Sequence, residues 1–132
     1  MGFLSNIFGS GDDSVLGLAK KIKKLLENGP SEVNLTDNNI GEFQKLSQEI
    51  RDKYPDHFYS SCVWLFELTA TRGVYVSGPG VDEMIKEYIV KTITLEGEYN
   101  PQSSEEKEVK RYFVRILNTC VDMANKNGII SV

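Results

Sequence analysis

Apolar side chains recur every three or four positions along most of this chain, and that spacing constrains its fold more than any other feature of the sequence. The longest stripe lies between residues 104 and 127 and comprises Val109, Tyr112, Phe113, Ile116, Cys120, Met123 and Ala124. Because an α-helix turns once in about 3.6 residues, this spacing places all of them on one face and predicts an amphipathic helix. Gly128 suits the left-handed position that ends a helix, so Ile129 can fold back onto the last turn.

Four shorter segments carry the same pattern, at residues 13–28, at 37–54, from 56 onward and at 81–95. Proline ends the first two, because Pro30 and Pro55 cannot continue a helix. The third segment ends either at Arg72-Gly73 or at Gly78-Pro79, and we favour the longer helix because small residues would then line one of its edges. Five amphipathic helices with short connections predict a single-domain all-α bundle over residues 12–132.

The segment that starts at Asp56 is the most apolar of the five. A helix that is apolar on most sides lies at the centre of a bundle, so we expect this helix to be the central one. The predicted core therefore includes Trp64, Phe66, Phe113 and Ile116.

Residues 1–11 stand apart from the predicted bundle, as an apolar arm followed by a Gly/Ser linker. The arm has four bulky apolar residues and no charged side chain: Phe3, Leu4, Ile7 and Phe8. The first predicted helix then carries a group of lysines: Lys20, Lys21, Lys23 and Lys24. An apolar piece followed by a basic helix is typical of a weak membrane-surface anchor, so a peripheral membrane protein is one alternative. An arm that docks on its own bundle, or that is unordered, is the interpretation we favour.

The reactive side chains do not form a recognisable catalytic or metal site. His57 is the single histidine, and it is expected to be a surface or capping residue. Cys62 and Cys120 lie on apolar stripes, where burial raises the pKa of a thiol and makes it inert. No Cys-x-x-Cys or His-x-x-x-His spacing occurs, so we expect no metal and no cofactor. Two cysteines also make no disulfide framework, which indicates a reducing, cytoplasmic setting.

Two other motifs that can carry chemistry are better explained by structure. The glycines in Ser77-Gly78-Pro79-Gly80 resemble a phosphate cradle, but acidic residues follow at once and would repel phosphate. Paired carboxylates such as Glu105 and Glu106 fall in a predicted first helical turn, where solvent and the helix dipole keep both ionised. We therefore predict no enzymatic activity. An unrecognised site, for instance one with Glu67, Arg72 and Tyr75, remains a second alternative.

Charge and tyrosine content favour a protein partner. Residues 81–108 contain eight acids and three lysines, so their net charge is 3 − 8 = −5, while the whole chain carries −4. This acidic balance predicts no nucleic-acid partner and can steer a protein with a basic surface. Six tyrosines also favour contacts, because tyrosine combines a large ring with a polar tip. The predicted partner-binding residues are Asp82, Glu83, Glu87, Glu96, Glu98 and Tyr99.

The sequence thus predicts a non-enzymatic protein–protein interaction domain, of the adaptor, regulatory or inhibitor type. The partner is another protein, and a second copy of this chain is one admissible partner. The two alternatives are the membrane-surface protein and the small enzyme described above.

Overall fold

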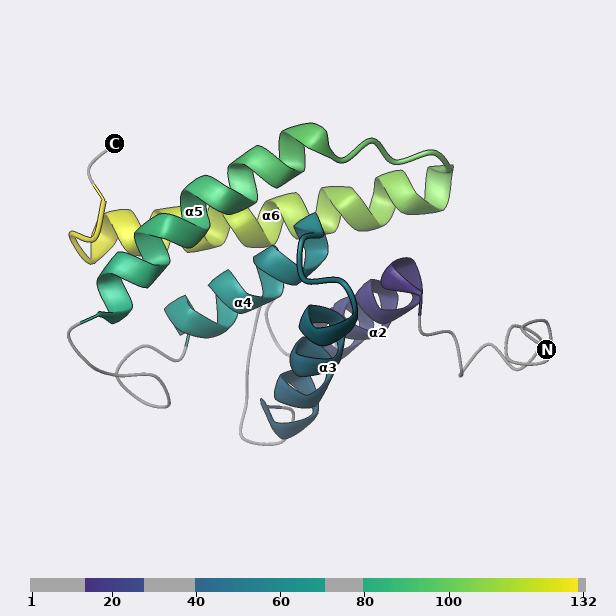
Figure 1. Cartoon of the computed structure of the whole chain (residues 1–132), viewed down its shortest axis with the longest axis horizontal. Helices are drawn as coiled ribbons and strands as arrows, with labels where there is room; N and C mark the ends of the chain where they lie inside the picture. Colours follow the sequence, from purple (N-terminus) through teal and green to yellow (C-terminus); the bar gives the residue numbers. More distant parts are fainter. Residues whose placement is uncertain (1–13, 28–39, 71–79, 131–132) are drawn as a thin grey trace.

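A computed structural model describes residues 14–27, 40–70 and 80–130, and within these ranges the chain forms helices and no strand (Figure 1). The helices are α2 (Val15–Glu27), α3 (Ile40–Lys53), α4 (Phe58–Ala70), α5 (Val81–Glu98) and α6 (Ser104–Lys126). The prediction of a single all-α helical bundle is confirmed. The apolar arm at residues 1–11 lies outside the described residues, and so does the predicted continuation of α4 beyond residue 70.

The helices form two groups that meet at α4. Helices α5 and α6 are an antiparallel pair joined by a short loop, and α4 packs against both of them (Figure 1). Since α5 and α6 also contact each other, these three helices form a closed triangle of contacts. Helices α2 and α3 pack together on the other side, where α3 contacts α4 and α2 contacts α6.

The core forms around α4, as its apolar sequence predicts. Phe66, Phe113 and Ile116 are all buried, and the Phe66 ring meets the ring of Phe43 from α3 edge to face, with centroids 5.6 Å apart. The prediction was wrong for Trp64, which is only half-buried. Trp64 lies at the edge of α4 where α3 and α5 leave the helix partly uncovered, and a guanidinium group covers its ring in place of core side chains.

The end of α5 and the cap of α6 were not predicted from the sequence. Helix α5 continues to Glu98, three residues past the predicted end, and the N–H of Tyr99 still donates to the Leu95 carbonyl. Helix α6 begins at Ser104, as predicted, and its N-cap is Ser103: the Ser103 Oγ accepts a hydrogen bond from the Glu106 N–H at 3.0 Å and donates to the Glu106 carboxylate at 3.4 Å. Ser103 and Glu106 therefore form a Ser-x-x-Glu capping arrangement at the start of α6.

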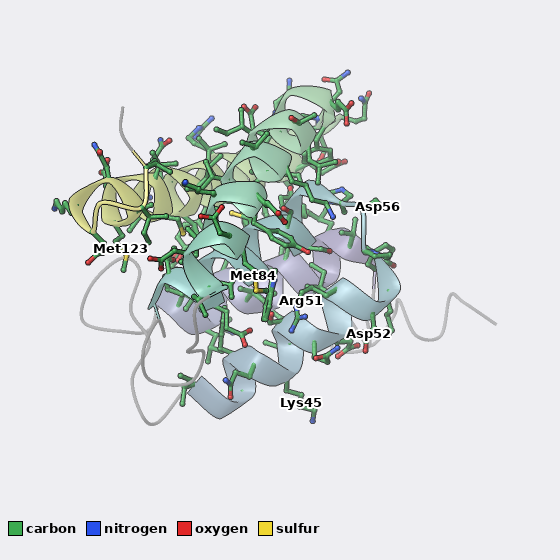
Figure 2. All side chains as sticks on the ribbon, turned by 60° about the vertical axis from the view of Figure 1, so that its left-hand side comes forward. Lys45, Arg51, Asp52, Asp56, Met84 and Met123 are labelled. Carbon is green, nitrogen blue, oxygen red and sulfur yellow. The ribbon has the colours of Figure 1, made fainter. Side chains whose placement is uncertain are left out.

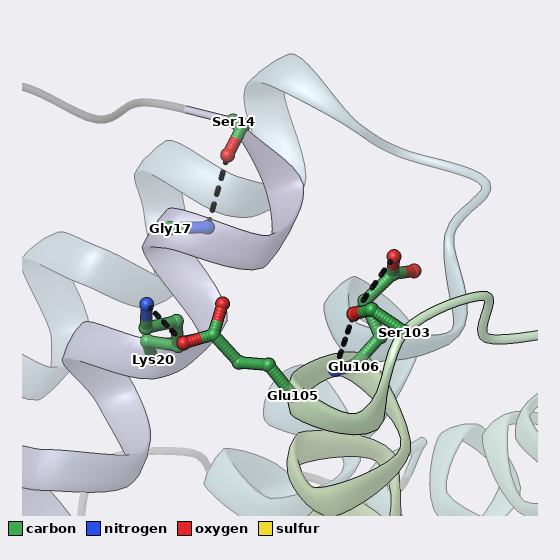
Figure 3. Close-up of polar contacts among 6 residues, drawn as sticks. All are labelled: Ser14, Gly17, Lys20, Ser103, Glu105 and Glu106. Carbon is green, nitrogen blue, oxygen red and sulfur yellow. Dashed lines mark hydrogen bonds and ion pairs between the residues drawn. The ribbon is translucent and has the colours of Figure 1, made fainter. Parts of the chain in front are cut away.

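The ends of α2 and α6 are secured by contacts that Figure 3 shows together. Ser14 caps α2, because its Oγ accepts the Gly17 N–H at 3.0 Å. Lys20 on α2 then reaches Glu105 in the first turn of α6, with Nζ and Oε2 2.9 Å apart. The N-terminal turns of two helices that are far apart in sequence thus lie side by side.

The C-terminal end of α6 follows the sequence prediction closely. Gly128 adopts a positive φ of 72°, which few other residues tolerate, and it reverses the chain. The N–H of Ile129 then donates to the Ala124 carbonyl at 2.8 Å, and the Ile129 side chain is buried. This hydrogen bond gives the Ala124 carbonyl, in the last turn of α6, a partner, and the Ile129 side chain covers the end of the helix.

Candidate functional site

The acidic residues of α5 that are predicted to bind a partner are divided between its exposed face and a half-buried flank. Glu83, Glu87 and Glu98 are exposed, whereas Asp82 and Glu96 are half-buried on the flank of the helix that faces its neighbours. Lysines of α5 alternate with these carboxylates, so the helix does not present a continuous acidic strip.

Ion pairs compensate part of the charge that the sequence concentrates between residues 81 and 108. The pairs are Glu83 with Lys86 at 3.7 Å, Glu96 with Lys110 at 3.0 Å, and Glu105 with Lys20 at 2.9 Å. Exposed pairs of this kind contribute little to stability, but they lower the local field that would steer a basic partner.

Tyr99, the tyrosine predicted at the partner surface, is largely committed to contacts within the protein. Its hydroxyl lies 3.0 Å from the Tyr59 hydroxyl and donates to the Glu106 carboxylate at 3.3 Å. Its ring meets the His57 ring with centroids 4.7 Å apart, and its carbonyl accepts a hydrogen bond from Lys110. The side chain of Tyr99 is half-buried, and these contacts connect the α5–α6 loop to the start of α4.

His57 caps α4, as one of its two predicted roles requires. Its Nδ1 accepts the Tyr59 N–H at 3.1 Å, and its ring packs against the Tyr59 ring at 4.8 Å. Burial lowers the pKa of His57, and the Glu106 carboxylate partly opposes that shift. Burial and the hydrogen bond with Tyr99 raise the pKa of Tyr59, so this cluster favours neutral imidazole and neutral phenols.

The two cysteines lie at the buried contact between α4 and α6, where the sequence predicts inert thiols. Cys62 Sγ donates to the Phe113 carbonyl at 3.2 Å, and Thr69 donates to Cys120 Sγ at 3.4 Å. Burial raises the pKa of Cys62 well above its usual value and that of Cys120 to about 12. Neither thiol ionises readily, which disfavours a nucleophilic role.

The residues of the two alternative functions are only partly described. Lys20 pairs with Glu105, and Lys23 pairs with Glu27 and lies over the Tyr112 ring, so both lysines face partners within the bundle. Lys21 and Lys24 complete the predicted basic group, whereas Phe3, Leu4, Ile7 and Phe8 lie outside the described residues. Glu67 is buried on α4, and Arg72 and Tyr75 also lie outside the described residues.

A groove that the sequence does not predict runs over α4, between α3 and α5. It has a volume of about 270 Å³, and we call it the tryptophan groove. It is lined from α3 and the following turn by Arg51, Asp52, Pro55 and Asp56, from α4 by Ser60, Ser61 and Trp64, and from α5 by Tyr88 and Lys91.

Arg51 and Trp64 are in direct contact in the tryptophan groove. The guanidinium carbon lies 4.3 Å from the centroid of the indole ring, which is within cation–π range. Arg51 is also held from its own helix, since Nε donates to Ser47 Oγ at 3.2 Å and Nη2 to Gln48 Oε1 at 3.4 Å. Figure 2 shows Arg51 turned toward the other helices, whereas Lys45 on the same helix points away from them.

The opposite wall of the groove repeats this chemistry on α5. Lys91 Nζ lies 5.3 Å from the centroid of the Tyr88 ring. The floor between the walls is fixed by hydroxyl contacts: Ser61 and Thr92 share a hydrogen bond of 2.6 Å, and Ser60 donates to the Ile50 carbonyl at 3.0 Å. Ser61 thus connects α4 to α5, and Ser60 connects α4 to α3.

No group of three residues able to hold a metal ion occurs among the described residues, and no helix described there is long and apolar enough to cross a membrane. A comparison of this chain with protein-family models, curated protein sequences and solved structures finds no match. Sequence patterns did not single out Arg51 or Trp64 as site residues. The sequence feature that could have indicated this groove is the position of Trp64, which falls on the same side of the most apolar helix as Ser60 and Ser61.

Proposed function

We propose that this protein is a non-enzymatic protein–protein interaction domain, and that its tryptophan groove is the surface that holds the partner. One observation carries this proposal: a half-buried tryptophan, stacked by an arginine, lines a groove walled by two further helices. Tryptophan, tyrosine and arginine are the residues that most often dominate the binding energy of protein interfaces, and the groove contains all three.

The rigidity of the groove supports the same proposal. Arg51 is already positioned by Ser47, Gln48 and the indole ring, so a partner would not have to order a long side chain when it binds. The entropy cost of association falls when contact residues are ordered in advance. The acids of α5 are partly paired with lysines, and we propose for them only a secondary role, in the rate at which the partner approaches.

Affinity capture with matched variants tests the proposal. The intact protein, Arg51→Ala, Lys91→Ala and the control Lys45→Ala would each be used as bait, and captured proteins would be quantified by mass spectrometry. We expect a partner that the intact protein and Lys45→Ala retain equally and that both groove variants lose. Thermal unfolding of each bait shows whether the variants remain folded.

The purified partner is then titrated while Trp64 fluorescence is recorded. Trp64 is the one tryptophan of the chain, so a change in its emission reports contact at the groove itself. If every captured protein binds the groove variants as well as it binds the intact protein, the groove is not the partner surface and the proposal fails.

A further inference from the structure

We infer that the tryptophan groove recognises an acidic peptide segment of its partner, in which a carboxylate is placed between Arg51 and Lys91 and a neighbouring apolar or aromatic side chain lies against Trp64. The inference deepens the proposed function and rests on it. It is carried by the placement of two cations on opposite walls of one groove with an aromatic ring between them.

Arg51 keeps donors available for a ligand. Its contacts with Ser47, Gln48 and the carboxylate of Glu67, the last at 4.0 Å, use Nε and Nη2. Nη1 donates to no residue in the described part of the chain. The contact with the indole ring and the hydrogen bonds of Nε and Nη2 restrict the position of the guanidinium group, so Arg51 can offer Nη1 to a carboxylate with little loss of side-chain freedom.

Lys91 supplies the second charge from the opposite wall. Its side chain is exposed and forms no ion pair with any residue that the structure describes. Two acids line the groove with these cations: Asp52 accepts a hydrogen bond from Gln48 at 2.8 Å, and Asp56 lies on the turn after α3. Glu67, 4.0 Å from Arg51 Nη2, offsets part of the arginine's charge, whereas no described carboxylate forms an ion pair with Lys91. The groove therefore combines two cations, Arg51 and Lys91, with two acids, Asp52 and Asp56, which lie at the C-terminal end of α3 and on the turn that follows it.

A peptide fits this chemistry better than a bare inorganic anion. A phosphate or sulfate ion needs several donors, but the hydroxyls of Ser60 and Ser61 are already engaged with Ile50 and Thr92. A bare anion would also leave the Trp64 ring wet, whereas an apolar side chain beside the carboxylate would cover it. The acids near the turn would in turn accept hydrogen bonds from backbone amides or a basic residue of the same segment.

Selection from a phage-displayed library of short random peptides tests the inference even while the partner is unidentified. The intact protein is the target, and selected peptides are synthesised and titrated while Trp64 fluorescence is followed. We expect them to be enriched in Asp or Glu next to an aromatic or large aliphatic residue. Arg51→Gln and Lys91→Gln should each weaken binding about tenfold, as loss of a charged hydrogen bond predicts, and Lys45→Gln should leave it unchanged.

Two further measurements sharpen the result. Replacing the peptide's acidic residue with Gln should cause a similar loss, and that loss should not add to the loss from Arg51→Gln, because both remove the same contact. Binding should also weaken as salt is raised, since the Debye length falls from about 10 Å at 0.1 M to about 3 Å at 1 M.

The outcomes separate this inference from the proposed function. Peptides without acidic residues that still change Trp64 emission would overturn the acidic segment and leave the groove as a partner surface. Acidic peptides that bind Arg51→Gln and Lys91→Gln as tightly as the intact protein would also overturn it. Displacement of the peptides by millimolar inorganic phosphate would replace the peptide site with an anion site. If no selected peptide changes Trp64 emission, the inference fails, and the affinity capture with Arg51→Ala and Lys91→Ala alone decides whether the groove is the partner surface.

Discussion

Truncation of one core ring, in Phe66→Ala, tests whether α4 is the centre of the bundle. Phe66 is 3% exposed and meets Phe43 edge to face at 5.6 Å. Removing a buried phenylalanine ring costs about 3–5 kcal/mol, because the lost transfer energy is joined by the energy of the cavity left behind. Part of this cost belongs to the aromatic pair, whose geometry contributes about 0.5–1.5 kcal/mol beyond burial.

Such a loss is a large fraction of the free energy of unfolding, which is about 5–15 kcal/mol for a domain. The melting temperature should fall by roughly 10–20 °C for a chain of this size. Urea unfolding followed by circular dichroism gives the same change as a shift of the midpoint, with the denaturant slope unchanged if the bundle remains one cooperative unit.

Two matched variants make the reasoning refutable. Phe66→Leu keeps most of the apolar volume and should cost about 1 kcal/mol. Val90→Ala removes an apolar side chain that is 66% exposed and should change stability by less than about 0.5 kcal/mol. If Phe66→Ala unfolds at the midpoint of the parent protein, then α4 is not central and the packing described above is wrong.

The capping and thiol contacts lead to three further predictions. Folding lowers the pKa of His57 below its ordinary 6.5, so the contribution of neutral His57 to stability is complete above about pH 6.5 and is lost as the pH falls below that value. The urea midpoint of the parent protein should therefore drop between about pH 7 and pH 5.5. It should drop less for His57→Asn, which can still cap the Tyr59 N–H but does not titrate. Ser103→Ala should lower the free energy of unfolding by about 1 kcal/mol, whereas Ser103→Asp should restore it; equal midpoints for parent and alanine variant would show that the cap contributes nothing. Thiol reagents should label Cys62 and Cys120 slowly in native protein and rapidly in urea, and fast native labelling would contradict their burial.

The arrangement of apolar residues was sufficient to predict the five helices, because each buries one stripe against its neighbours. The stripe does not specify where a helix ends. Helix α5 continues past its apolar stripe because Glu96 is held by Lys110 from α6, a contact between helices that no local pattern reveals. The cap at Ser103 was not predicted, although Ser103 and Glu106 have the Ser-x-x-Glu spacing of a capping box and Ser104, which is followed by Lys107, does not.

The tryptophan groove was beyond prediction from sequence alone. Its two cations, Arg51 and Lys91, are separated by 40 positions, and only the packing of α3 and α5 on either side of α4 brings them to one groove. Trp64 was assigned to the core because its neighbours in α4 are apolar. The exposed strip of α4 exists because α3 and α5 do not close over it, which depends on the crossing of three helices.

The closed triangle formed by α4, α5 and α6 has a consequence for how the protein opens. Each helix of the triangle packs against the two others. Helices α2 and α3 pack against each other, and each packs mainly against one helix of the triangle: α2 against α6, and α3 against α4. Native-state hydrogen exchange should therefore be slowest for amides of the triangle, and the α2–α3 pair should open first as a separate unit.

The tryptophan groove lies across the boundary between these two units, since α3 supplies one wall and the triangle supplies the floor and the other wall. Opening of α2 and α3 dismantles the groove, so a bound ligand favours the closed state by mass action. A partner seated over Trp64 would thus slow amide exchange in α3, which lies at the groove, and in α2, which does not touch it. Binding at the tryptophan groove would thus be detected as slower amide exchange in α2, on the far side of the protein.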